Sequence, residues 1–152
     1  MTDAPGYIVR IERTFSAPAE AVFDAWTSAE VMRRWFHAGP DWETPEADVD
    51  LRVGGSVRIV MRRPDGTRAA AHGEYRVIDR PRRLVMVWTF DDLPSNTQLI
   101  ELTFSESEGA TTVRMINSGI VSEGRRQSQQ LGWLECLSEL ERVLAGLSER
   151  AG

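Results

Sequence analysis

The sequence predicts an α+β fold in which a curved antiparallel sheet of about seven strands wraps around a long C-terminal helix, with two short helices after strand 1. Apolar residues recur at every second position in successive segments that are joined by short turns, which is typical of antiparallel strands. Two other regions have helical spacing instead. The chain has 152 residues, of which 41% are apolar. We therefore expect a single domain spanning residues 1–152.

The N-terminal region predicts one strand followed by two short helices. Alternating apolar residues place the strand at residues 7–15. Pro18 suits the first turn of a helix, where its missing N–H is not needed. Thr27 and Glu30 have the spacing of a capping box and indicate the start of a second helix. This helix must end before Pro40, which cannot continue it.

Six further segments alternate with a period of two and are expected to be strands. Gly54-Gly55 is expected to form the hairpin turn between the first two of them. The segments cover residues 46–53, 56–62, 69–79, 83–90, 96–106 and 110–117.

The last region predicts a long helix that Ser122 caps and that extends to about Ala145. Its apolar stripe includes Trp133, Leu137 and Leu140. A curved sheet can bury this stripe on its concave face. Such an arrangement leaves gaps between helix and sheet, and gaps of this kind are common ligand sites.

Composition excludes several classes of function. The net charge of −5 disfavours a sequence-independent nucleic-acid binder, which needs a positive field. The chain has no lysine, which excludes Schiff-base chemistry and a P-loop. We expect no membrane span, because no run of 18 apolar residues occurs.

The start of the chain is unlike a signal peptide, and the lone Cys136 cannot form an internal disulfide, so we expect a cytoplasmic protein. Cys136 lies on the apolar side of the long helix and is expected to be a buried small hydrophobe. The two histidines and this cysteine lack the spacing of a zinc site. We expect no metal and no cofactor.

Three ionisable residues, His37, His72 and Glu101, are weak candidates for acid–base chemistry. A group of this kind inside an apolar cavity has a shifted pKa and can move a proton. Arg76 shares a face with His72, and Thr103 shares one with Glu101, which favours exposure of both. We therefore assign no catalytic residue.

The stretch "WFHAGPDW", residues 35–42, places three aromatic side chains where the second short helix ends. We expect it to form one rim of the gap, with Trp35 and Phe36 either sealing the end of the sheet or meeting a ligand. The residues expected to point inward and bind a ligand are rich in Met and Trp, which suits either a loosely filled core or a pocket. They are Phe23, Trp26, Trp35, Leu51, Met61, Met86, Trp88, Phe90, Met115, Trp133 and Leu137.

Four segments together resemble the AHSA1-like branch of the START/Bet v 1-like (SRPBCC) superfamily: "FSAPAEAVFDAWTSAEVMRRWF", "VDLRVGGSVRIVMRRPDG", "GEYRVIDRPRRLVMVW" and "LGWLECLSELERVL". The most specific matches are Asp50 to Gly55 and the pair Gly132-Trp133. The resemblance implies a helix-grip fold with an internal hydrophobic cavity. Members often carry a histidine four residues before the tryptophan, where this chain has Gln129.

Three functions are compatible with these observations. The first is non-catalytic binding of a hydrophobic or aromatic small molecule, with a lipophilic small molecule as the partner. The second is a cyclase- or hydrolase-like tailoring enzyme that uses the cavity. The third, by analogy with the activators that name the branch, is a chaperone-regulator-type interaction module. Homodimerisation through a sheet edge or a helix stays open.

Overall fold

The computed structural model describes residues 6–151 and the side chains of residues 6–147. Residues 1–5 and residue 152 lie outside the described residues. The expectation that the chain does not start with a signal peptide concerns a segment that begins within residues 1–5. In chain order the elements are β1 (Tyr7–Phe15), α1 (Ala19–Thr27), α2 (Ala29–Trp35), β2 (Glu43–Val49), β3 (Ser56–Arg62), β4 (Arg68–Asp79), β5 (Arg83–Phe90), β6 (Thr97–Ser107), β7 (Ala110–Ile120) and α3 (Glu123–Ala151).

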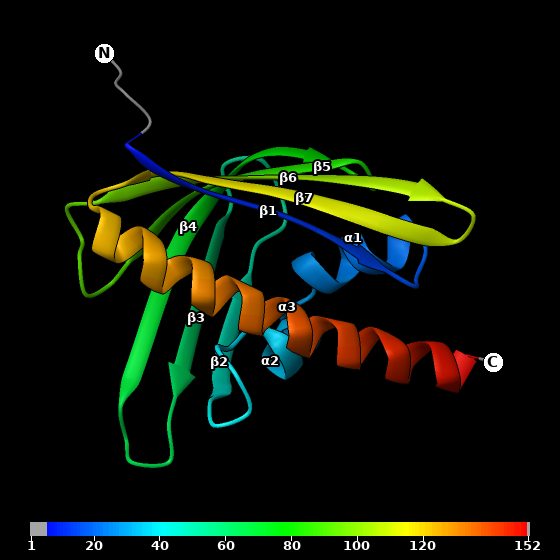
Figure 1. Cartoon of the computed structure of the whole chain (residues 1–152), viewed down its shortest axis with the longest axis horizontal. Coiled ribbons are helices and arrows are strands. Elements are labelled where there is room, and N and C mark those ends of the chain that lie inside the picture. Colours follow the sequence, from blue (N-terminus) through cyan, green and yellow to red (C-terminus); the bar gives the residue numbers. More distant parts are fainter. Residues whose placement is uncertain (1–5, 152) are drawn as a thin grey trace.

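The seven strands form one open antiparallel sheet in the order β1-β7-β6-β5-β4-β3-β2, so β1 and β2 are its edges. Helix α3 runs across one face of the curved sheet, and α1 and α2 lie on the same side (Figure 1). Side chains from both layers, such as Ile59, Leu102 and Leu140, are fully buried between them. The predicted α+β helix-grip architecture is therefore confirmed.

The two short helices form as expected, but a different residue caps α2. The Ser28 hydroxyl accepts a hydrogen bond from the Val31 N–H at 3.3 Å. The predicted capping box at Thr27 is wrong, because the Thr27 hydroxyl instead donates to the Phe23 carbonyl, 3.1 Å away, inside α1. Ser122 does cap α3: its hydroxyl accepts from the Arg125 N–H at 3.2 Å. The helix continues to Ala151, beyond the predicted end near Ala145.

The segment between β2 and β3 differs from the predicted strand. β2 ends at Val49, and residues 50–55 form a loop in which Leu51 is 44% exposed. The prediction that Leu51 points into the core is wrong, because the alternating pattern continues past the last residue that pairs with β3. Gly55 lies so close to the loop backbone that a Cβ would be 2.0 Å from the Asp50 carbonyl oxygen. This close approach explains the glycine in the Asp50–Gly55 motif.

No helix among the described residues is long and apolar enough to cross a membrane.

Candidate ligand cavity

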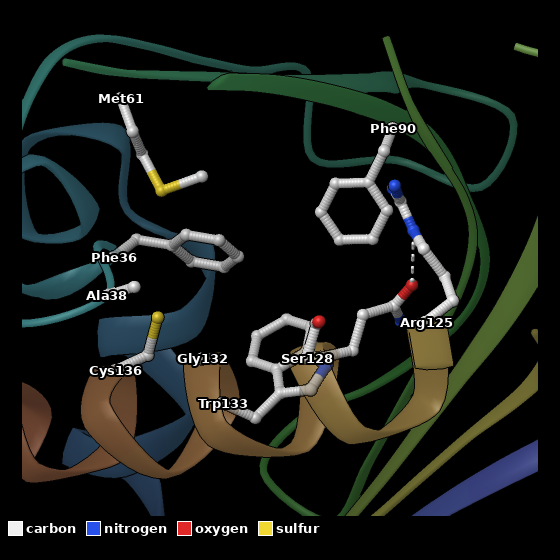
Figure 2. A pocket seen from close by; sticks show the side chains of 10 residues that line it. Phe36, Ala38, Met61, Phe90, Arg125, Ser128, Gly132, Trp133 and Cys136 are labelled. Carbon is white, nitrogen blue, oxygen red and sulfur yellow. Dashed lines mark hydrogen bonds between the residues drawn. The ribbon is translucent and has the colours of Figure 1, made fainter. Parts of the chain in front are cut away.

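A cavity of about 240 Å³ lies between α3 and the sheet, beside the loop that follows α2. In Figure 2, Met61 of β3, Phe90 of β5 and Phe36 approach the side chains of α3 from the opposite wall. The lining consists of Phe36, Ala38, Met61, Phe90, Arg125, Ser128, Gln129, Gly132, Trp133 and Cys136.

The inner wall of the cavity belongs to a packed aromatic cluster. The Phe36 ring centroid is 5.5 Å from that of Trp133 and 5.8 Å from that of Trp88. Trp26 packs edge-on against Trp35 at 4.7 Å, and its ring lies 6.1 Å from Trp133. Aromatic pairs in this geometry attract one another beyond the effect of buried area. The wall is therefore held in place without a ligand.

The aromatic residues of the stretch "WFHAGPDW" differ in their positions relative to the cavity. Trp35 is fully buried, and its indole N–H donates to the Ala25 carbonyl at 2.9 Å. Phe36 lines the cavity. Trp42 is half-buried away from the cavity, with the Arg63 guanidinium 4.8 Å from its ring centroid. Trp35 is thus part of the buried core, and its neighbour Phe36 meets the open space.

The residues predicted to bind a ligand have three different positions. Met61, Phe90 and Trp133 line the cavity. Leu51 is in the exposed loop. The others are buried in the core without lining the cavity, namely Phe23, Trp26, Trp35, Met86, Trp88, Met115 and Leu137.

The sequence reasoning missed most of the α3 contribution to the lining. Arg125, Ser128, Gln129 and Gly132 precede Trp133 and Cys136 at helical spacing, so all six share one side of α3. These residues could have been predicted by extending the helical spacing of Trp133 toward the start of the helix. Polar side chains and a glycine occupy those positions, and an apolar pattern does not include them.

A buried amide network forms the polar floor beneath the cavity. Gln129, which lines the cavity, donates to Asn117 Oδ1 at 2.8 Å and to Gln98 Oε1 at 2.9 Å. Asn117 Oδ1 also accepts from the Trp133 indole N–H at 3.1 Å. Gln98 and Asn117 are at most 3% exposed. The network thus fixes the positions of Gln129 and Trp133 on the cavity wall.

Arg125 forms one edge of the opening. Its guanidinium makes two hydrogen bonds to Asp92, at 2.8 and 2.9 Å, and lies 5.3 Å from the Phe90 ring centroid. These hydrogen bonds hold the pKa of Asp92 below its usual range. These contacts hold the Arg125 guanidinium beside Phe90 and Asp92 at the edge of the cavity.

His37 is buried, but it contacts α3 and β2 and does not line the cavity. Thr44 donates its one hydroxyl proton to the Phe36 carbonyl at 2.8 Å, so His37 Nδ1, 3.0 Å away, must carry the proton that Thr44 accepts. Nε2 faces Glu139 Oε1 at 3.9 Å. Burial is the largest influence and lowers the pKa of His37, Glu139 opposes it, and Arg142 adds to the lowering.

The other two candidates for acid–base chemistry also lie outside the cavity. His72 is 52% exposed at its side chain and hydrogen-bonds to Asp91 at 3.0 Å. Glu101 is one-third exposed and pairs with Arg83 at 3.3 Å. None of the three candidates therefore lines the cavity. Among the described residues, no group of three or more His, Cys, Asp or Glu is placed to hold a metal ion.

Three buried polar atoms lack a hydrogen-bond partner within residues 6–147: Trp26 Nε1, Tyr75 Oη and Trp88 Nε1. Burial also raises the pKa of the Tyr75 hydroxyl far above its usual value. An unpaired buried group costs about 1–3 kcal/mol. The core beside the cavity therefore contains buried polar atoms without hydrogen bonds.

The fold defines a helix-grip protein, and a small, partly open pocket lies beside its long helix. The family model described as "Activator of Hsp90 ATPase homolog 1-like protein" matches residues 16–145, so the chain belongs to the AHSA1-like family of the SRPBCC (Bet v 1-like) superfamily. No curated protein matches the sequence significantly.

Solved structures agree with this assignment. An AHSA1-like protein from Aeromonas hydrophila is 27% identical, with a TM-score of 0.79, and the match covers 93% of this chain and 94% of that chain. A protein from Rhodobacter sphaeroides is 25% identical with a TM-score of 0.81 over 95% and 97% of the two chains. An HSP90 activator from Plasmodium falciparum is 25% identical with a TM-score of 0.73 over 92% and 97%.

Proposed function

We propose that this protein binds a small aromatic molecule, non-catalytically, in the cavity under α3. The observation that carries the proposal is the cavity itself, with a volume of about 240 Å³ and walls of Phe36, Met61, Phe90 and Trp133. Aromatic and thioether side chains favour flat apolar ligands through dispersion and ring contacts.

The volume sets the size of the ligand. An apolar cavity of about 150 Å³ holds one benzene ring, and pockets for drug-sized ligands begin near 300 Å³. The cavity in this protein lies between these values. A ligand of one or two fused rings therefore fits.

Gly132 offers a way to test the proposal. It lies in the interior of α3 and lines the cavity, and a Cβ built there would meet nothing within 4 Å. Glycine inside a helix is about 1 kcal/mol less favourable than alanine. Because Gly132 lines the cavity, a larger side chain at this position would occupy part of its open space.

The experiment compares naphthalene-2-carboxamide binding to the wild type, to Gly132→Leu and to Gly146→Leu by calorimetric titration. Leucine favours helix at either position, and a Cβ at Gly146 also meets nothing within 4 Å, so Gly146→Leu is the matched control. We expect binding by the wild type and the control, and loss of binding in Gly132→Leu. Equal binding by all three proteins, or none by the wild type, would refute the proposed site.

A second candidate function is activation of an Hsp90 chaperone. The family match and the likeness to the Plasmodium falciparum HSP90 activator favour it. Leu131 and Leu134 on the outer side of α3 are 66% and 38% exposed and offer apolar area for a protein partner. The test is the ATPase rate of purified Hsp90 with wild-type protein or with Leu131→Ser. Stimulation that the substitution lowers would support this function, and an unchanged Hsp90 rate would exclude it.

A further inference from the structure

Arg125 is the one ionised side chain that the described part of the chain places around the cavity. The other lining residues are apolar or aromatic, or carry a hydroxyl, an amide or a thiol. Burial raises the pKa of the Cys136 thiol far above its usual value, so this group stays neutral. The response of the cavity to a charged ligand therefore depends on whether Arg125 is free to meet it.

Arg125 is already paired with a carboxylate of the chain itself. Its Nη1 and Nη2 donate to the two carboxylate oxygens of Asp92 at 2.8 and 2.9 Å, and its Nε donates to Gln129 Oε1 at 3.4 Å. The same hydrogen bonds hold the pKa of Asp92 below its usual range, so Asp92 stays ionised at neutral pH. A second carboxylate on this guanidinium would lie close to Asp92, and like charges so placed repel each other.

The neighbouring donors of the cavity wall are also in use. Gln129 gives its side-chain amide protons to Asn117 and Gln98, and Trp133 gives its indole proton to Asn117. The Ser128 hydroxyl, which points into the cavity in Figure 2, carries a single neutral donor. Taking a carboxylate out of water is unfavourable unless a cation or several donors replace the water. The wall therefore offers an anion little compensation, whereas a neutral polar group needs only one hydrogen bond.

Resting on the proposed function, we infer that the cavity selects a neutral aromatic ligand over an anionic one, and that Asp92 sets this selectivity by pairing with Arg125. The ligand class is an aromatic amide, alcohol or ketone, and aromatic acids are disfavoured. The net charge of −5 acts in the same direction, because its long-range field repels anions. The Asp92 side chain is 69% exposed, so its replacement should change ligand choice without unfolding the protein.

The test measures the dissociation constants of naphthalene-2-carboxamide and naphthalene-2-carboxylate, which differ in charge and little in shape, by calorimetric titration at pH 7. The proteins are the wild type, Asp92→Asn and Asp91→Asn. Asp91 is the matched control, because its loss changes the net charge equally and its arginine partner is Arg58, 3.2 Å away. A double variant, Asp92→Asn with Arg125→Gln, shows whether the effect of Asp92 passes through Arg125.

For the wild type we expect the amide to bind at least about tenfold more tightly than the carboxylate. Asp92→Asn should lower this ratio about tenfold, because Arg125 can then pair with the carboxylate of the ligand. Asp91→Asn and the double variant should keep the wild-type ratio.

Equal affinities in the wild type, or tighter binding of the carboxylate than of the amide, would overturn the inference and leave the proposed function standing. A ratio that Asp92→Asn does not change, that Asp91→Asn changes as much, or that stays lowered in the double variant would also overturn it. Failure of the wild type to bind the amide would instead refute the proposed function, and the inference with it.

Discussion

Replacing Gly132 by alanine tests whether α3 keeps a glycine for the sake of the cavity. The new Cβ meets nothing within 4 Å, so no clash opposes the gain in helix propensity. Alanine is favoured over glycine inside a helix by about 0.5–1 kcal/mol. In a chain of 152 residues this gain should raise the melting temperature by about 1–4 °C.

The assay is urea and thermal unfolding of the wild type, Gly132→Ala and Gly146→Ala, followed by titration of each with naphthalene-2-carboxamide. Both variants should be stabilised, because neither Cβ has a neighbour within 4 Å. Only Gly132→Ala should bind the amide more weakly, since only Gly132 lines the cavity. A lower melting temperature for Gly132→Ala would refute the reasoning about open space, and unchanged binding would refute its link to the ligand.

Three further predictions concern buried polar groups. Tyr75→Phe should leave the free energy of unfolding unchanged or raise it by about 1 kcal/mol, because the hydroxyl has no partner and is costly to bury. Asn117→Ala should lower that free energy by about 2–4 kcal/mol, because the Trp133 indole and Gln129 lose a buried acceptor. Both are measured by urea unfolding. His37→Asn should flatten the loss of stability between pH 7 and pH 5. Burial holds the folded pKa of His37 below its usual 6.5, so its contribution is present above that pH and is lost as the pH falls.

Each of these predictions has a result that contradicts it. A loss of more than about 1 kcal/mol in Tyr75→Phe would mean that its hydroxyl has a partner, such as a buried water. Asn117→Ala with wild-type stability would show that the amide network is not needed for packing. For His37, a pH profile of His37→Asn that matches the wild-type profile would refute its role.

The sequence pattern predicted the ends of elements that are marked by residue type. The bounds of β1 agree with the predicted residues 7–15, and Ser122 caps α3 as expected. The extent of β2 was not predictable from alternation, because pairing ends at Val49 while the apolar pattern runs on to Val53. The end of a strand depends on where its hydrogen bonds to the neighbouring strand end. The alternation of apolar residues within one segment does not show this.

The cavity was harder to predict than the fold. Inward-pointing residues can be recognised by apolar spacing, yet most of them, including Trp88 and Met115, fill the core without meeting open space. Whether space remains depends on how large side chains from distant elements fit together. Gly132 belongs to the motif Gly132-Trp133 in the sequence, but its relation to the cavity depends on how α3 packs against Phe36 and Met61.

The open sheet also bears on how copies of this protein meet. β2 is an edge strand whose sequence, ETPEADV, carries three acidic residues and Pro45. Pro45 offers no N–H to an incoming strand, and two β2 edges side by side would bring carboxylates together. This edge therefore resists strand addition and the fibrous aggregation to which unprotected sheet edges are prone.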